Sequence, residues 1–344
     1  MRAHRLLLAL LAVGSLVGVA YVNQATEPTG VKMAHAAERF LGTLGPEQKA
    51  KATFAFDDKE RTDWDFVPLQ DKDKKPTRKG VKLEDMSNEQ REAALALLRT
   101  GTSGDGYTKA TTIMSLEAIL RELEEGKGPV RNPGWYFFTV FGTPSKTGKW
   151  GWRVEGHHLS LNFTLDGGKV VSSTPAFFGA NPATVMEGKR EGLCTLASAE
   201  DLARELFLAL SEDDKKAAGL DKQFPEVQSH STAPRVGKPI GLAGEKMNEK
   251  QRNLLAKLID AYAERMPPEV QEAEMKQVRD AGLDKVYFAF AGGAEPGKPH
   301  TYRVQGPTFV IEFLNVQADG AKHPANHIHS CWRSIKGDFG LATN

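Results

Sequence analysis

The stretch WGWRVEGHHLSLNFT, residues 150–164, contains two adjacent histidines within a segment that otherwise reads as a β-strand. Side chains along a strand alternate between its two faces. In HHLSLNFT one face carries His157 with leucine and phenylalanine, and the other carries His158 with Ser, Asn162 and Thr. The pattern predicts opposite positions for the two imidazoles, with His157 supporting the core and His158 facing a polar pocket.

A similar pattern returns near the end of the chain, which makes an internal duplication the organising hypothesis. The matched pairs of segments are 85–101 with 246–266, 134–142 with 285–293, and 150–168 with 300–320. The order in both is helices, a hairpin and a long strand. We therefore expect an α+β fold of two related halves, each with helices followed by antiparallel strands, packed as one globular unit with one continuous sheet or two related sheets.

The helices and boundaries follow from local signals. Ser87 with Gln90 forms a capping-box pattern before a helix that ends at Gly101. Apolar spacing predicts a second helix at Thr108–Glu125, and residues 198–218 are also predicted to be helical. A segment rich in Pro and Gly at 225–246 separates the halves, so the expected division is 26–225 and 226–344, after a leader at 1–25.

The leader has the features of a targeting segment. Arg2 and Arg5 precede an apolar run from Leu6 to Ala20, and small residues follow. A cleaved signal peptide is the favoured interpretation, and an uncleaved N-terminal anchor is the alternative. Both place the folded part outside the cytoplasm, as a periplasmic or secreted protein.

Composition limits the function classes. The chain has 344 residues, of which 40% are hydrophobic and 26% charged, and its formal net charge is +1. The chain is therefore long and apolar enough to form a hydrophobic core. Its net charge is too small to indicate a nucleic-acid partner. No membrane contact is expected beyond the N-terminal segment. P-loop, G-x-G-x-x-G, H-E-x-x-H and G-x-S-x-G motifs are absent from the sequence, so we expect no nucleotide cofactor.

Alignment of the halves places His158 and Asn162 in equivalent phases to a carboxylate of the second half. Arg153 matches Arg303, and Asn162 falls on Glu312, the only charged residue in PTFVIEFL. A carboxylate in such a run is costly to bury unless it is paired, protonated or bound to a metal. Glu312 is therefore a candidate metal ligand.

The segment NHIHSCWR, residues 326–333, supplies two more imidazoles. His327 and His329 share a strand face, which Cys331 and Arg333 continue. The sequence predicts that His158, His327, His329 and Glu312 bind zinc, copper, iron or manganese. Two alternatives stay open: a metal-free pocket in which a histidine does acid–base work near Glu312, and histidines that only satisfy backbone groups.

Other polar residues are assigned supporting or proton-transfer roles. Glu155 or Asp65 is the candidate proton shuttle of a metal-dependent hydrolase or oxidoreductase acting on a small molecule. The residues expected to line or support the pocket are His157, Asn162, Arg153, Asn181, Asn326 and Arg333. The alternative function is a non-catalytic exported module that binds a metal or a small-molecule ligand. Cys194 and Cys331 fit either a disulfide or two free thiols.

Several long motifs give the chain a resemblance to a known family. EGHHLSLNFT, FFGANPA, YRVQGPTFVIEF and ANHIHSCWR with GDFG resemble the uncharacterised family called domain of unknown function 3500, from about residue 40 to the end. The resemblance implies that the HHLSLNF and NHIHS segments belong to the family's pattern, and it implies no reaction. Two departures are Cys331, where the pattern has an aliphatic residue, and LATN after GDFG, where family members continue with a helical tail.

Overall fold

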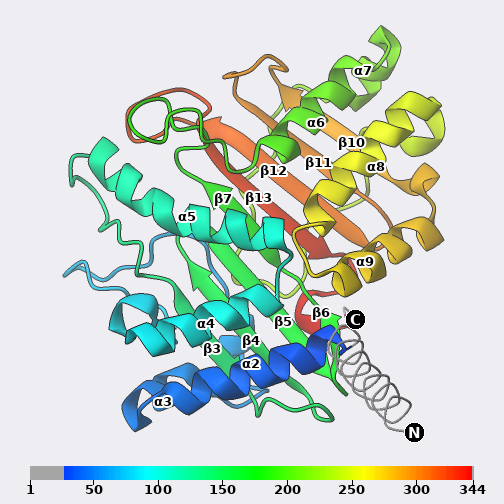
Figure 1. Cartoon of the computed structure of the whole chain (residues 1–344). Helices are drawn as coiled ribbons and strands as arrows, with labels where there is room; N and C mark the ends of the chain where they lie inside the picture. The colour runs from blue at the N-terminus through cyan, green and yellow to red at the C-terminus, as the bar shows by residue number, and fades with distance from the viewer. Residues whose placement is uncertain (1–26, 343–344) are drawn as a thin grey trace, which may run out of the picture.

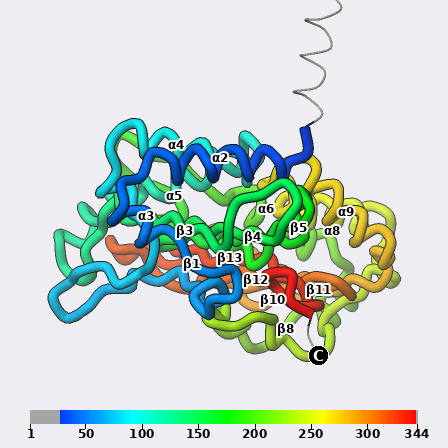
Figure 2. Tube along the Cα trace, turned by 90° about the horizontal axis from the view of Figure 1, so that it is seen from below, coloured from blue at the N-terminus to red at the C-terminus, as the bar shows by residue number. Residues whose placement is uncertain are grey.

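The computed structural model describes residues 27–342, and its centre is one mixed β-sheet with helices on one face and long loops on the other (Figures 1 and 2). The α-helices are α2 (Thr29–Thr43), α3 (Pro46–Ala52), α4 (Asn88–Thr100), α5 (Gly104–Leu123), α6 (Ala197–Leu208), α7 (Glu212–Ala218), α8 (Glu249–Ala263) and α9 (Pro268–Ala281). The first-half strands are β1 (Thr53–Phe54), β2 (Val81–Lys82), β3 (Phe137–Phe141), β4 (Trp150–Gly156), β5 (Leu159–Asp166), β6 (Lys169–Ser172) and β7 (Ala176–Ala180). The later strands are β8 (Gly219–Leu220), β9 (Leu242–Ala243), β10 (Tyr287–Gly292), β11 (His300–Gln305), β12 (Phe309–Gln317) and β13 (His327–Ser334).

The sheet has 13 strands, and its main order is β1-β3-β4-β5-β7-β13-β12-β11-β10-β8. β1 and β8 run parallel to their neighbours β3 and β10, and the other pairs are antiparallel. β13 comes last in the sequence, yet it lies at the centre between β7 and β12. The α+β class is therefore confirmed, with a single continuous sheet.

The ends of the helices follow the sequence signals closely. The Ser87 hydroxyl accepts a hydrogen bond from the Gln90 backbone N–H, and the Gln90 side chain accepts one from the Ser87 N–H, so the predicted capping box is present at α4. Asn248 and Gln251 repeat this arrangement at α8. The segment predicted as one helix at 198–218 is two helices, because Ser211 caps a new helix after α6 ends.

The helix-covered face of the sheet holds the larger apolar core, to which α2, α4, α5, α6, α8 and α9 all contribute. Trp152 of β4 stacks on Phe163 of β5, with ring centroids 4.5 Å apart. Gly101 lies directly against this pair, and a Cβ there would come within 2.6 Å of the Trp152 ring. The glycine that ends α4 thus lets the helix approach the sheet.

Two long segments cover the opposite face: residues 55–80, here called the first cover loop, and residues 221–241, the second cover loop. They enclose a smaller apolar cluster of Trp64, Phe66, Phe177, Val227, Leu314, Cys331 and Phe339. His329 of β13 points to this face and contacts Phe66 of the first cover loop and Glu226 of the second.

The placement of His157 and His158 in a strand is wrong. β4 ends at Gly156 and β5 begins at Leu159, which pair with each other, so the two histidines form the tight turn of a hairpin. His158, the second residue of the turn, has a φ of 63°, which places its backbone in the left-handed region. The apolar alternation on both sides conceals the turn, because neither Gly nor Asn occupies its two central positions.

The predicted leader at 1–25 lies outside the described residues. Among residues 27–342, no helix combines the length and apolar character needed to cross a bilayer. Cys194 and Cys331 are both free thiols.

Candidate metal centre

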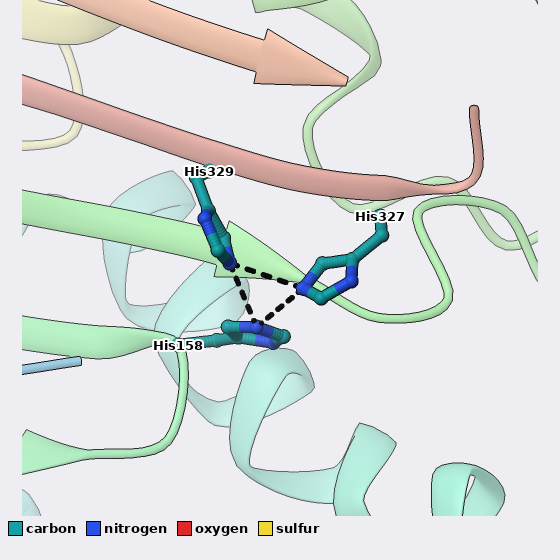
Figure 3. A group of neighbouring side chains, drawn as sticks. All are labelled: His158, His327 and His329. Atoms are coloured by element: carbon teal, nitrogen blue, oxygen red, sulfur yellow. Dashed lines mark hydrogen bonds between the residues drawn. The ribbon is translucent and has the colours of Figure 1, made fainter. Parts of the chain in front are cut away.

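Three imidazoles converge where the β4–β5 turn meets the start of β13 (Figure 3). The Nε2 atom of His158 lies 2.9 Å from that of His327 and 3.2 Å from that of His329, and the last two are 3.0 Å apart. His158 and His327 are 169 residues apart in the sequence, so the fold and no local motif brings them together.

Hydrogen bonds among the three rings cannot satisfy this arrangement. Each Nε2 of a neutral imidazole either donates or accepts, so at most two of the three contacts pair a donor with an acceptor. The third contact opposes two lone pairs or two N–H groups. A cation bound to all three lone pairs removes the conflict, which makes the triad a candidate metal centre.

The spacing also defines which side of the ion stays open. With metal–nitrogen bonds of about 2.05 Å, nitrogens 2.9–3.2 Å apart subtend roughly 90–103° at the ion. The three ligands would then occupy one side of the coordination sphere. The other side is left for water or a substrate atom.

Burial favours the neutral form of the triad imidazoles, which is the form that binds metals. His158 is 3% exposed and His329 is 7% exposed, whereas His327 is partly exposed. Desolvation and the neighbouring imidazoles hold the pKa of His158 well below its usual range and lower the pKa of His327 to about 2. Both rings are therefore neutral near pH 7, with lone pairs available for coordination.

The outer nitrogens of two rings have polar partners. The Nδ1 atom of His329 lies 2.8 Å from Glu226 Oε2, and because a carboxylate accepts, the ring donates. This leaves the lone pair on Nε2, the tautomer that a metal needs, and the carboxylate makes the ring a stronger ligand. The Asn181 Nδ2 atom lies 3.3 Å from His327 Nδ1, and since an amide nitrogen donates, this orientation puts the ring proton on Nε2. Coordination through His327 Nε2 requires the amide to turn, so that its Oδ1 accepts from Nδ1–H.

His157 lies behind the triad. Its ring lies against the His158 ring, with centroids 3.7 Å apart and planes tilted by 31°. Its Nδ1 pairs with Glu117 of α5, while the Arg131 guanidinium approaches at 3.3 Å. Burial lowers the pKa of His157, although Glu117 opposes this effect. These contacts join the turn to α5, which fits the supporting role predicted for His157.

Backbone contacts fix the turn against its neighbours. The His158 N–H donates to the Phe66 carbonyl of the first cover loop, and the Gly179 N–H donates to the His158 carbonyl, both at 2.8 Å. A Cβ on Gly179 would lie 2.8 Å from the Ile328 carbonyl oxygen and 3.2 Å from His158 Cβ. The absence of a side chain at Gly179 lets the turn and β13 approach one another.

A cavity of about 870 Å³ reaches the triad at His327, the most exposed of the three histidines. Its walls come from the end of α5, the segment 181–187 and the start of the β12–β13 connection. The lining residues are Glu122, Leu123, Glu124, Glu125, Lys127, Gly128, Arg131, Asn181, Glu187, Gln317, Ala318, Asp319, Gly320, Ala321, Lys322 and His327. A small molecule in this cavity would contact the triad at His327.

The structure places Glu312 elsewhere. Its Oε1 accepts from Arg303, 3.1 Å away on the adjacent strand, and it is not one of the side chains that converge on the triad. Burial raises the pKa of Glu312, and Arg303 opposes that shift. Glu312 thus forms a buried ion pair.

The two candidate proton shuttles also contact other groups. Glu155 pairs with Arg78 at 2.8 Å and accepts from the Asp65 backbone N–H at 3.0 Å. The Asp65 carboxylate contacts His230 at 2.8 Å. Both belong to a polar network that anchors the cover loops, and neither hydrogen-bonds to the triad.

The remaining predicted residues hold loops and strands in place. Asn162 donates to the Pro175 carbonyl, and Arg153 donates to the Glu60 carbonyl. Asn326 donates to the Thr184 carbonyl and to Asp319, while Arg333 pairs with Asp338. Of the predicted supporting residues, His157 and Asn181 contact the triad directly.

Sequence reasoning missed Glu226, Glu117 and Arg131. Glu226 lies in a loop with no motif, and its histidine partner is 103 residues away. Glu117 did leave a signal, because it shares the apolar helical face of Ile113 and Leu120. A carboxylate on such a face indicates a buried partner.

Comparison with known proteins adds the family and nothing about the reaction. No curated protein and no solved structure matches the chain. A family model described as "Protein of unknown function (DUF3500)" matches residues 26–341. The chain therefore belongs to the DUF3500 family, as its motifs indicate.

Proposed function

We propose that this protein is a metal-dependent hydrolase that acts on a small hydrophilic molecule, with His158, His327 and His329 as the ligands. The observation that carries the proposal is the convergence of three Nε2 atoms on one side of a single point. Three imidazoles without a thiolate suit zinc first and copper(II) second. A zinc ion with three histidines and an open position lowers the pKa of bound water to near 7, which supplies a hydroxide nucleophile.

The surroundings of the triad support this chemistry. The Phe66 and Phe177 rings contact His329, with centroids 5.1 and 5.6 Å away, and lower the local dielectric constant. Glu226 fixes the tautomer of His329. The cavity at His327 gives a small molecule access to the open side of the ion.

A non-catalytic metal-binding module is the second candidate, and one observation favours it. Within residues 27–342, no Asp or Glu joins the three histidines in the metal-ligating group, and Glu226 touches the outer nitrogen of His329. A proton acceptor beside the bound water would then have to come from the substrate or from solvent. An open coordination position with turnover separates the hydrolase from the module.

We also propose that the two halves arose by duplication and that the protein works outside the cytoplasm. The strand order supports duplication, because β1, β3, β4 and β5 approach the centre from one edge as β8, β10, β11 and β12 do from the other. The basic and apolar character of residues 1–25 supports export.

The first experiment measures metal content by elemental mass spectrometry on protein that lacks residues 1–25 and carries no histidine tag. About one equivalent of zinc is expected, lost in the His327→Ala/His329→Ala double variant and retained in the control His323→Ala. His323 lies in the β12–β13 connection and is absent from the triad.

Cobalt substitution then tests the open position, because azide binding to an exchangeable site changes the visible spectrum of cobalt(II). A spectrum that azide alters supports the hydrolase. A bound metal that no exogenous ligand reaches would favour the binding module. Failure to bind zinc, copper, iron or manganese would overturn both candidates.

A further inference from the structure

The cavity at His327 is lined mainly by polar and charged residues. Its lining contains one leucine, no aromatic residue, and otherwise charged, amide, alanine and glycine residues together with His327. Apolar ligands gain affinity by burying apolar surface, and in these walls that surface comes from one leucine, two alanines and the carbon atoms of polar residues. Charge and hydrogen bonding must therefore select the ligand.

Several of the charges neutralise one another. Arg131 pairs with Glu124 at 2.8 Å, and Lys127 pairs with Glu125 at 2.5 Å. Arg131 is also occupied by His157. These side chains contribute little net field to the cavity.

The charges that remain are mostly negative. Within the described part of the chain, Glu122 and Glu187 have no ion-pair partner, and Lys322 is the one lining cation without one. The Asp319 carboxylate is not available to a ligand, because it is 1% exposed and its two oxygens accept hydrogen bonds from Ala321, His323 and Asn326. The entrance to the metal is therefore acidic.

A buried amide lies beside the metal in the same wall. Asn181 is 6% exposed and lines the cavity, and one of its two polar atoms contacts His327. The other polar atom has no hydrogen-bond partner: it is Oδ1 as the amide stands, and it becomes the amide N–H group when His327 binds a metal through Nε2 and donates from Nδ1 to Oδ1. An unpartnered buried amide is costly unless a ligand completes it, so this wall is suited to a bound polar group.

We propose that the cavity selects hydrophilic substrates that carry a cationic amino group a few bonds from the group that meets the metal. This inference rests on the proposed function, since it takes the ion at His158, His327 and His329 as the reacting centre. The amino group would lie beside Glu122 and Glu187, and the reacting group would lie between the ion and Asn181. Opposite charge concentrates such a substrate at the entrance.

Three hydroxamates of equal length test the proposal: 4-aminobutanohydroxamate, pentanohydroxamate and glutaric monohydroxamate. They share the metal-binding group, and their far ends are cationic, neutral and anionic. The titration uses the cobalt-substituted protein in low salt and follows its visible spectrum. The cationic probe should bind tightest and the anionic probe weakest, with about a fivefold step for each unit of charge, as expected for partly screened charges several ångströms apart.

The Glu122→Gln/Glu187→Gln variant isolates the entrance, because it changes no metal contact. It should lose most of the preference for the cationic probe, as should wild-type protein in 0.5 M salt. Glu89→Gln on α4, which is exposed and outside the cavity, is the matched control and should keep the preference.

Each failure has a separate meaning. Probes that bind without the charge order, or with an order that the double variant leaves intact, would overturn the cationic selection and leave the metal centre standing. A loaded metal that none of the three probes reaches would overturn the open site itself, and with it both proposals. Failure to bind any metal would do the same.

Discussion

The β4–β5 and β11–β12 hairpins occupy corresponding places on the two sides of the sheet, and they differ at their turns. Their strands match closely: Arg153 faces Asn162 in one, and Arg303 faces Glu312 in the other. The first turn is His157-His158, which packs against the start of β13. The second turn contains Pro307 and Thr308, and its Thr308 carbonyl accepts from the N–H of Ile335, just beyond the end of β13. Two similar hairpins thus differ in their turns: one supplies a candidate metal ligand, and the other makes a backbone hydrogen bond.

The largest expected difference between the turns is in metal binding. His158→Ala removes one of the three ligands. It should lower the affinity for the metal by about a thousandfold, since each ligand contributes several kcal/mol to the binding free energy. Thr308→Ala at the other turn should leave the metal affinity unchanged. Competition with a chromogenic chelator measures both affinities. Equal affinities in the two variants would remove the distinction between the turns.

His157→Ala should instead act on stability. It leaves Glu117 without its imidazole partner inside the protein, at a cost of about 2 kcal/mol to the free energy of unfolding. Urea unfolding of the metal-free protein measures this cost, and metal analysis should still find about one equivalent in the folded variant. Loss of the metal at unchanged stability would make His157 a ligand and contradict the supporting role.

The carboxylates of Glu226 and Glu312 should differ in their effect on metal affinity. Glu226→Gln weakens the contact that orients His329, so metal affinity should fall about 10- to 100-fold, the usual effect of losing such a partner. Glu312→Gln, in the ion pair with Arg303, should leave metal affinity unchanged. The chelator competition used for His158 reads both variants. An effect of Glu312→Gln as large as that of Glu226→Gln would return Glu312 to the ligand set.

The smallest effect concerns the contact between the cover loops, where His230 lies between Asp63 and Asp65. Partial burial disfavours protonation of His230, but the two carboxylates outweigh it and raise its pKa. A raised pKa means that the stabilisation is complete below the unfolded pKa of about 6.5 and disappears as pH rises through the folded pKa.

Since half of the His230 side chain is exposed, His230→Ala should cost only about 0.5 kcal/mol at pH 5.5 and close to nothing at pH 9. Urea unfolding at the two pH values provides the measurement. A cost that does not change with pH would show that packing, and not charge, joins the loops at this point.

Many helices and strands could be predicted from the sequence because the patterns that indicate them involve neighbouring residues. The capping box of α4, the apolar spacing of α5 and the H-x-H pattern of β13 each depend on neighbouring residues. The pairing of Arg303 with Glu312 was also within reach. It follows from hairpin register once Gln305 and Val310 are recognised as partners across the turn.

The rest depended on contacts between distant parts of the chain. Nothing near Glu226 in the sequence indicates His329, and the left-handed conformation of His158 is held by Phe66 and Gly179 from other segments. Alternating polarity led to the placement of His157 and His158 on opposite faces. In the structure the two rings lie against each other in the turn, because a tight turn breaks the period of two on which alternation depends.

The central position of β13 has a consequence for the order of events in synthesis. The strands β3 to β5 and β10 to β12 pair with near neighbours in sequence, and both sets are complete before β13 emerges from the ribosome. Only β13 joins them, and it brings His327 and His329 with it. A chain that stops before residue 327 therefore holds His158 alone, together with two unjoined parts of a sheet. Metal capture at the triad would mark the moment at which β13 has joined the two parts of the sheet.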